Sequence, residues 1–152
     1  MITIKKSATA DTRTCDWSKV SKDELYKSSQ QHKGDIVKGM QYFVGMMKDA
    51  MLLHDDDKLN DIDGFHADFI TGFKNTTWWD KHRKINRHHL LEVDGVPDDV
   101  NLVDVLDMIT DCVMAGMGRA GSIYPIEITP ELLKLAFDNT VERLKAEIVV
   151  ED

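Results

Sequence analysis

The feature that most constrains the fold is a series of apolar residues at helical spacing in the first third of the chain. These residues recur every three or four positions, at Ile36, Val37, Met40, Phe43, Val44, Met47 and Met51. Such spacing places the side chains on one stripe of an α-helix. Upstream, Ser21 and Glu24 have the spacing of a capping box, which starts a helix. The pattern predicts one long helix that begins near residue 21 and turns its apolar stripe toward a core.

Four later segments repeat this periodicity, at about residues 61–73, 77–91, 101–116 and 130–144. Asn101 is a favourable N-cap for the third segment, and Pro130 suits the first turn of the last one. A chain of 152 residues is long enough for one domain with a real core and short for two. We therefore expect an all-α fold, a single bundle of about five to six helices over residues 21–152, with a short N-terminal arm at residues 1–20.

Charge and cysteine content exclude several classes of protein. A formal net charge of -8 argues against a broad basic face that covers nucleic acid, although it allows a small nucleotide ligand. Two cysteines, Cys15 and Cys112, make no disulfide framework, and no apolar run of about 18 residues indicates export or membrane insertion. We expect a cytoplasmic protein with no membrane partner, and a homo-oligomer is left open.

The residues that point to chemistry are the histidines, all 6 of which lie between His32 and His89. His54 and Asp55 stand together where an apolar run ends, so an imidazole and a carboxylate leave one point of the backbone. These groups are common ligands of divalent first-row metals. His32 lies four residues before Ile36 and is therefore predicted on the inward stripe, where a histidine bonded within the core is the plainer interpretation.

A second set of ligand-type residues lies in the segment 77–91. In one continuous helix, His82, Asn86 and His89 share a face and His88 points elsewhere.

Asp111 adds a carboxylate among apolar neighbours, where burial is costly unless the group is paired or binds a metal. Asp104 and Asp107 lie nearer the start of the same predicted helix, where the helix dipole already favours acids. For this reason Asp111 is the candidate ligand of the three.

Positive charges accompany these ligands in an otherwise acidic chain. They are Lys58, three residues after Asp55, then Lys81, Arg83, Lys84 and Arg87. A solvated basic face is the plainer interpretation, but positive charge among metal-type ligands also suits a phosphate-bearing substrate. Arg119 follows Gly116, where the helix is expected to end, in a loop that could close over an anion.

The order of these residues resembles the HD superfamily of metal-dependent phosphohydrolases, whose signature is a histidine, a later His-Asp pair and a final aspartate on an all-α scaffold. The resemblance covers about residues 22 to 115 and matches this signature at His32, His54, Asp55 and Asp111. His82, His88 and His89 are similar to the extra histidines of two-metal members, and Lys58 to a lysine of some branches. Small HD-like proteins of bacteriophages are also similar.

The resemblance implies an HD-like bundle that holds one or two divalent ions (Mn, Fe, Ni, Co or Zn). Its expected ligands are His32, His54, Asp55, His82, His88, His89 and Asp111, with the choice between His88 and His89 open. A metal-activated water would attack a phosphate ester, with Asp55 and Lys58 as catalytic residues. The phosphate-binding residues would be Lys58, Arg83, Arg87 and Arg119, and the substrate a nucleotide or a nucleotide-derived signal.

Two other interpretations belong to different classes. The residues could hold a metal that stabilises the fold or acts as a sensor in a helical interaction protein. In that case four protein ligands would occupy every coordination position of the ion. Alternatively, no metal binds, and the histidines are packing and surface residues of a partner-binding domain. An accessible pocket lined by Arg83 or Lys58 would instead favour hydrolysis.

Overall fold

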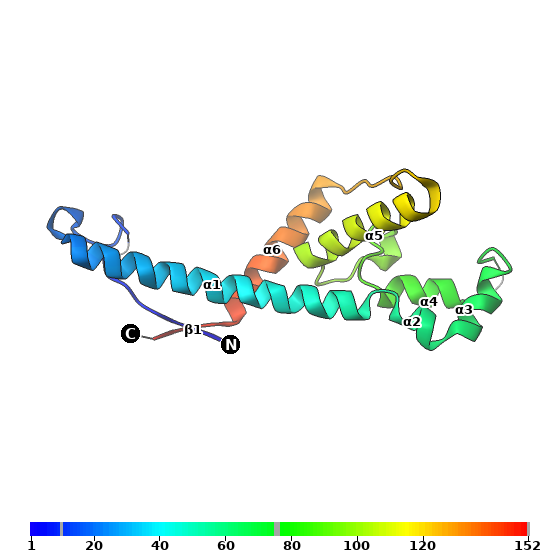
Figure 1. Ribbon diagram of the computed structural model, residues 1–152, viewed down its shortest axis with the longest axis horizontal. Coiled ribbons are helices and arrows are strands. Elements are labelled where there is room, and N and C mark those ends of the chain that lie inside the picture. Colours follow the sequence, from blue (N-terminus) through cyan, green and yellow to red (C-terminus); the bar gives the residue numbers. More distant parts are fainter. Residues whose placement is uncertain (10, 75–76, 152) are drawn as a thin grey trace. The chain divides into compact units, whose positions relative to one another are not determined.

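The computed structural model describes residues 1–9, 11–74 and 77–151, so Asp152, the last residue of the expected bundle, lies outside them. The elements are β1 (Ile2–Lys5), η1 (Trp17–Lys19), α1 (Lys22–Leu53), α2 (Asp56–Asn60), α3 (Ile62–Phe69), α4 (Trp78–Ile85), η2 (Val93–Gly95), α5 (Leu102–Ala120), α6 (Pro130–Ala146) and β2 (Ile148–Glu151) (Figure 1). The expected all-α class is confirmed, with a minimal sheet added. None of the helices in the described ranges is long and apolar enough to cross a membrane.

The chain divides into two compact units. Unit 1 comprises Met1–Gly45 and Glu142–Asp152, and unit 2 comprises Met46–Val141. The helices α1 and α6 therefore each contribute to both units. The expected arm at residues 1–20 falls in unit 1 together with more than half of α1.

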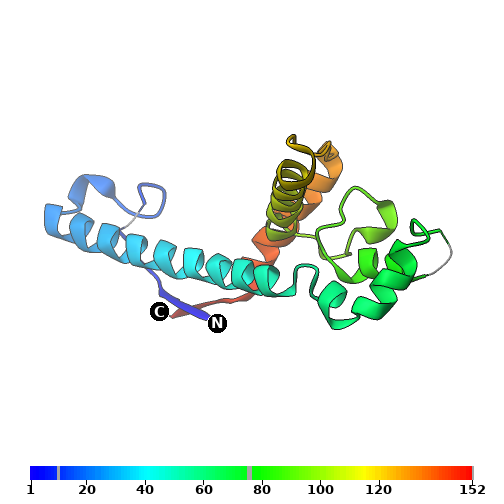
Figure 2. The same ribbon diagram turned by 45° about the vertical axis from the view of Figure 1, so that its right-hand side comes forward.

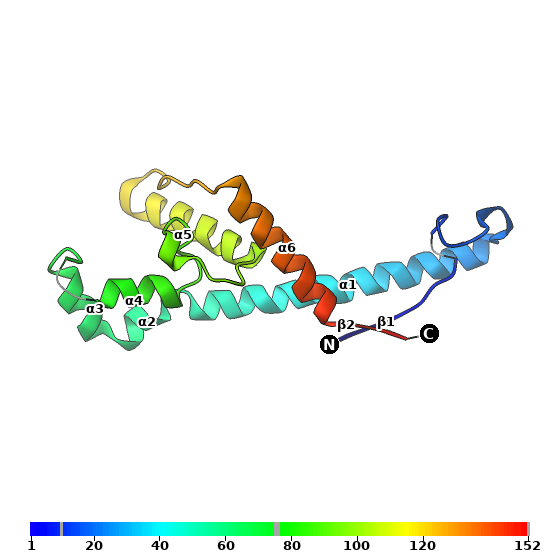
Figure 3. The same cartoon turned by 180° about the vertical axis from the view of Figure 1, so that it is seen from behind.

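Unit 1 contains the start of α1 and the two-stranded sheet. The Ser21 N–H donates to the Glu24 carboxylate at 2.9 Å, and the Glu24 N–H donates to Ser21 Oγ at 3.3 Å, which confirms the predicted capping box. The strands pair in parallel, with Ile2 opposite Ile148 (Figure 3). The two terminal segments of the chain therefore form one ladder.

The arm and the strand β1 contact one side of α1. Gln31 Nε2 donates to the Lys5 carbonyl at 2.6 Å, and Lys38 Nζ donates to the Thr3 carbonyl at 2.7 Å. Ser28 is the one buried residue among those described in unit 1, so no apolar side chain is buried there.

The side of α1 opposite these contacts was predicted to face a core, and the structure differs from that prediction. Val37 is 47% exposed, Met40 59% and Val44 43%, so the stripe that was predicted to face a core is open.

Unit 2 contains the hydrophobic core. Its buried members come from α5, α6 and the segment between α4 and α5: Leu90, Val100, Val105, Met108, Cys112 and Ala136. Asn101 caps α5 as predicted, in a capping box with Asp104. The Leu102 N–H donates to Thr140 Oγ1 at 2.9 Å, which joins the start of α5 to α6 (Figure 2). The last helix begins at Pro130, as its sequence predicts.

The end of α5 differs from the prediction. The helix does not stop at Gly116 but continues to Ala120, and Gly121 ends it in the left-handed conformation with φ 68. Gly116 is buried because the chain folds back over it, so that an added Cβ would lie 2.5 Å from the Tyr124 backbone nitrogen. Arg119, which was expected in a loop, is an exposed residue of the last helical turn.

Candidate metal centre

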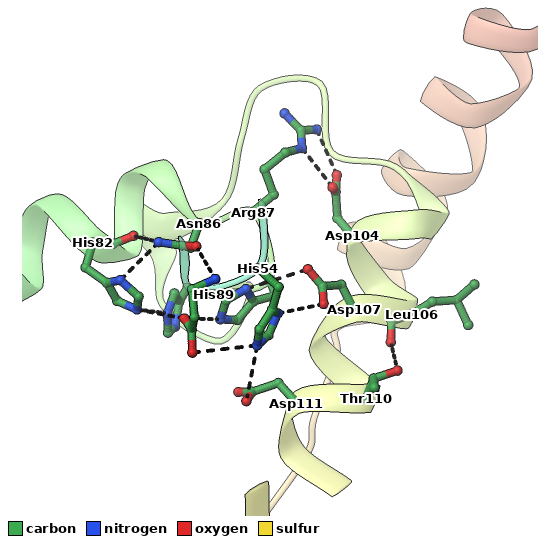
Figure 4. Close-up of polar contacts among 12 residues, drawn as sticks. His54, His82, Asn86, Arg87, His89, Asp104, Leu106, Asp107, Thr110 and Asp111 are labelled. Atoms are coloured by element: carbon green, nitrogen blue, oxygen red, sulfur yellow. Dashed lines mark hydrogen bonds and ion pairs between the residues drawn. The ribbon is translucent and has the colours of Figure 1, made fainter. Parts of the chain in front are cut away.

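Side chains with metal-ligating atoms converge in unit 2 (Figure 4). They form two overlapping groups, the first with Asp55, His82, His88 and His89 and the second with His54, His88 and Asp107. Within each group, one ligand atom from every residue lies within 4.8 Å of the others.

The His-Asp pair is positioned by a sharp turn between α1 and α2. Asp55 adopts the left-handed conformation, with φ 56 and ψ 15, and is the N-cap residue of α2. Aspartate and asparagine tolerate this conformation better than most other residues with a side chain. The Asp55 N–H donates to Asn86 Oδ1 at 3.0 Å, which ties the turn to the segment that follows α4.

The second set of histidines corrects the prediction of one helix over residues 77–91. Helix α4 ends at Ile85, and Asn86 leaves the helical conformation with φ -93 and ψ 111. Because the chain is no longer helical beyond this point, His88 and His89 both reach the cluster. The expectation that His88 points elsewhere was wrong because it assumed an unbroken helix.

The first group has the dimensions of a tetrahedral site. Asp55 Oδ1 lies 3.4 Å from His82 Nε2 and 3.6 Å from His88 Nε2. His89 Nε2 lies 2.9 Å from His82 Nε2. Ligands about 2.0–2.1 Å from a tetrahedral ion are about 3.3–3.4 Å apart. The two separations from Asp55 are close to this value, and the two imidazole nitrogens lie closer together than it, at 2.9 Å.

Asp55 Oδ1 is the atom that most clearly lacks a partner. It is buried and accepts no hydrogen bond from any described residue. A buried carboxylate oxygen in this condition is costly, because it has left water without a replacement. A cation between this oxygen and the three imidazoles would supply the missing positive charge.

Two further carboxylates set the orientation of the imidazoles. Asp57 lies 2.9 Å from His82 Nδ1, and Asn86 Nδ2 donates to the same carboxylate at 2.9 Å. With the proton of His82 on Nδ1, its Nε2 carries a lone pair that faces Asp55 Oδ1 at 3.4 Å and His89 Nε2 at 2.9 Å.

Asp107 acts in the same way from α5. Its Oδ1 lies 2.8 Å from His54 Nδ1, and its Oδ2 lies 3.6 Å from His88 Nδ1. The sequence interpretation passed over both Asp57 and Asp107. A signal for Asp107 was available, since it lies one helical turn before Asp111.

A more open set of atoms lies beside the first group. His54 Nε2 is 3.6 Å from Asp55 Oδ2 and 3.8 Å from Asp111 Oδ1. The side chains of His54 and Asp111 are 27% and 31% exposed, so this side of the cluster faces solvent. Lys58 Nζ donates to Asp55 Oδ2 at 2.6 Å, which confirms that the lysine lies on the same side as the carboxylate.

The electrostatics of the first group favour an ionised carboxylate at Asp55 and neutral imidazoles at His82 and His89. Burial acts to raise the pKa of Asp55, but the hydrogen bond and charge of Lys58 outweigh it, and the pKa lies below its usual value. Burial lowers the pKa of His82. Burial, with the neighbouring His88 and His82, lowers the pKa of His89 to about 3. Deprotonated ligands of this kind are the form that binds a metal ion.

These pKa values predict that the metal-free protein loses stability in mild acid. An unfolded histidine takes up its proton near pH 6.5, whereas folded His89 takes it up only at about pH 3. Between these values the unfolded state binds more protons, so the free energy of unfolding falls as the pH is lowered through this window. Urea denaturation with a chelator present, from about pH 7.5 to about pH 5, measures this decline.

The matched variants for this prediction are His89→Gln and His66→Gln. His66 is an exposed histidine of α3, so its replacement should leave the pH dependence of stability as it is in the wild type. His89→Gln should make the decline shallower. An unchanged decline in His89→Gln would contradict the pKa assigned to this histidine.

His32 is not brought to the cluster. It is exposed on α1 in unit 1. His32 is in neither of the two groups of metal-ligating residues found among the described residues, so its role as a ligand of the same ion as His54 stays a prediction.

Two of the three arginines expected to bind phosphate, Arg83 and Arg87, are paired within the protein. Arg83 donates to Asp80 at 2.8 Å and to Asp94 at 2.5 Å. Arg87 binds Asp104 through two bonds of 2.8 Å, and the hydrogen bond to Asp104 raises the pKa of Arg87. These contacts hold the chain together around the site, and the binding of phosphate by the two guanidinium groups stays a prediction.

Comparison with known proteins gives no assignment. No protein-family model, no curated protein and no solved structure matches this chain. The resemblance to the HD superfamily therefore depends on the residues alone, and His32 is in neither of the two groups of metal-ligating residues. What the protein does has to be inferred from the chemistry of this site.

Proposed function

We propose that the protein binds a divalent cation through Asp55, His82, His88 and His89 and hydrolyses a phosphate ester there. The observation that carries the proposal is the buried, unpartnered Asp55 Oδ1, which faces two imidazole nitrogens at 3.4 and 3.6 Å. A bound divalent ion supplies a Lewis acid that lowers the pKa of water toward about 7 and offsets charge on phosphoryl oxygens.

The open side of the cluster supports hydrolysis. His54 and Asp111 have partly exposed side chains, and Asp111 Oδ1 is 3.8 Å from His54 Nε2. The Asp111 carboxylate can accept a proton from an attacking water. Lys58 lies next to this opening through its bond to Asp55 and can donate to a phosphate oxygen.

A nucleotide is the substrate class to test first. The Lys58 ammonium lies 5.7 Å from the centroid of the Phe65 ring and 5.9 Å from that of Trp79. Aromatic rings beside a phosphate-binding cation provide a surface on which a base can stack. This arrangement supports a phosphorylated substrate that carries a base.

A structural metal site is the second candidate. Asp55 and three histidines already make four ligands, and the His82 and His88 side chains are 0% and 3% exposed. Four protein ligands without an open position are typical of zinc sites that stabilise a fold. In this case the protein binds metal and hydrolyses nothing.

Metal reconstitution followed by a substrate screen tests both candidates. Untagged protein is stripped with a chelator and loaded with manganese, iron, nickel, cobalt or zinc, and its metal content is measured by elemental analysis. Phosphate release is then followed with nucleoside mono-, di- and triphosphates, cyclic dinucleotides and a generic phosphodiester. We expect at least one ion per chain and metal-dependent release of phosphate. Metal without release for any substrate would favour the structural site, and no stoichiometric metal would contradict both candidates.

A further inference from the structure

The exposed side of α1 carries a regular seam that the fold leaves uncovered. Positions separated alternately by four and three residues run along it: Tyr26, Gln30, Lys33, Val37, Met40, Val44, Met47 and Met51. This alternation is the a/d pattern of a heptad repeat, in which a helix packs against another helix along its length. From Met40 to Met51 every seam position is apolar, and the exposed fractions of these residues range from 37% at Met47 to 70% at Met51.

The contacts that unit 1 makes with α1 lie on other heptad positions. Ser28 bonds to Ser7 and Thr9, at 3.3 and 2.6 Å. Gly39 approaches Leu144 of α6, where an added Cβ would lie 4.0 Å from its methyl groups. Because these contacts occupy the side of the helix away from the seam, they do not cover it.

Unit 1 lacks the core that a stable fold requires. None of the apolar side chains described in this unit is buried. A unit of this size normally offsets its loss of conformational entropy by burying apolar surface. The largest apolar surface that α1 can still bury is the seam.

The seam has the dimensions of a dimer interface. From Tyr26 to Met51 it is about 38 Å long at 1.5 Å per residue, which is nearly four heptads. Half the circumference of a helix about 11 Å across is about 17 Å, so the area of the strip is about 650 Å². Specific interfaces bury about 600–1,000 Å² on each partner, so one helix face is sufficient.

The charge around the seam suits a second copy of the same chain. With a net charge of -8, two copies repel one another over most of their surface. The positions that flank the middle of the seam, Gly34, Ile36, Gln41 and Phe43, are all uncharged. Two α1 helices can therefore approach along the middle of this strip, from Val37 to Val44, without like charges facing each other.

We propose that α1 is a dimerisation helix, and that the seam from Tyr26 to Met51 packs against the same seam of a second copy. The proposal concerns assembly and is independent of whether the histidine cluster binds metal. Isologous contacts of this kind are the commonest way in which soluble chains form oligomers.

The first test measures the mass of the full chain in solution by light scattering and sedimentation at about 100 µM. We expect a dimer for the wild type, a monomer with unchanged helix content for Met40→Glu, and a dimer for Met117→Glu. Met117 is a matched control because it is a methionine of α5 with 54% exposure, against 59% for Met40. A monomeric wild type would overturn the proposal and leave the seam to a different protein. A Met40→Glu variant that remains a dimer would also overturn it.

A second pair of variants covers the case in which Met40→Glu fails to fold. Lys33 occupies a seam position, so Lys33→Leu should lower the dissociation constant of the dimer at least about tenfold. His32→Leu is the control, since this neighbouring residue is also exposed on α1 but lies outside the seam. Equal dissociation constants for the two variants would overturn the proposal.

Discussion

Asp55→Asn is expected to weaken binding of a divalent ion more than about 100-fold and to abolish metal-dependent phosphate release. The substitution removes the negative charge of the one carboxylate that lies next to both His82 and His88. Titration of the metal-free protein against a chromophoric chelator gives the affinity, and the phosphate assay gives the activity.

Asparagine is the informative replacement because of the backbone at this position. Asp55 has φ 56, which asparagine tolerates better than alanine, and its N–H would still donate to Asn86. In an Asp55→Ala variant, the effect of losing the metal ligand could not be separated from the effect of backbone strain in the turn.

The matched control is Asp56→Asn, one residue further along the chain. Asp56 is exposed and bonds only to Asn60 within the contacts described for it, at 2.5 Å. Asp56→Asn should therefore bind metal as the wild type does. An Asp55→Asn protein that retains stoichiometric metal at wild-type affinity would remove the basis of the proposed function.

Arg87→Met is expected to lower the free energy of unfolding by about 2–3 kcal/mol. The side chain of Asp104 is 6% exposed, and it would lose both bonds to the guanidinium group. The loss should stay below that of a fully buried pair, because Arg87 is 38% exposed and Asn101 continues to donate to Asp104. Urea denaturation of the metal-free protein measures the change.

The same variant should also weaken metal binding. Arg87 joins the chain just before His88 to Asp104 in the first turn of α5, and Asp107 of the same helix contacts His54. Without the ion pair between Arg87 and Asp104 the imidazoles can move apart, so the affinity of the protein for the cation should fall together with its free energy of unfolding.

Arg83→Met is the comparison for this prediction. Its partners Asp80 and Asp94 have side chains 58% and 50% exposed, and such surface pairs contribute about 1 kcal/mol or less. If Arg87→Met instead left stability unchanged and raised only the KM for a phosphorylated substrate, the phosphate-binding role expected from the sequence would be restored.

Features that depend on neighbours in the chain were predictable from the sequence. The capping box at Ser21, the N-cap at Asn101 and the helix start at Pro130 each depend on bonds or dihedral preferences within about one helical turn. The contact between Asp55 and Lys58 is of the same kind, since three residues separate them. The end of α4 at Ile85 was missed because apolar and ligand-type residues continue beyond it at helical spacing.

The membership of the site was only partly predictable. His54, Asp55, His82 and the doublet of His88 and His89 carry a chemical signature in the sequence, and the structure brings them together. Asp107 was missed and His32 is in neither group, because residue type reports which atoms can bind a metal but not where separate elements meet.

Residue order alone was enough to specify helices, caps and the chemical nature of a metal-type cluster, since these arise from local bonding and from the identity of the side chains. Packing of distant segments decided the rest. The turn at Asp55 and the segment after α4 brought four ligands together, α5 placed Asp107 behind two of the imidazoles, and the two chain ends paired as strands. The packing also left the side chains of the α1 seam exposed. An apolar stripe in the sequence predicts that one face of a helix will be buried, but it does not specify whether the same chain or a second chain buries it.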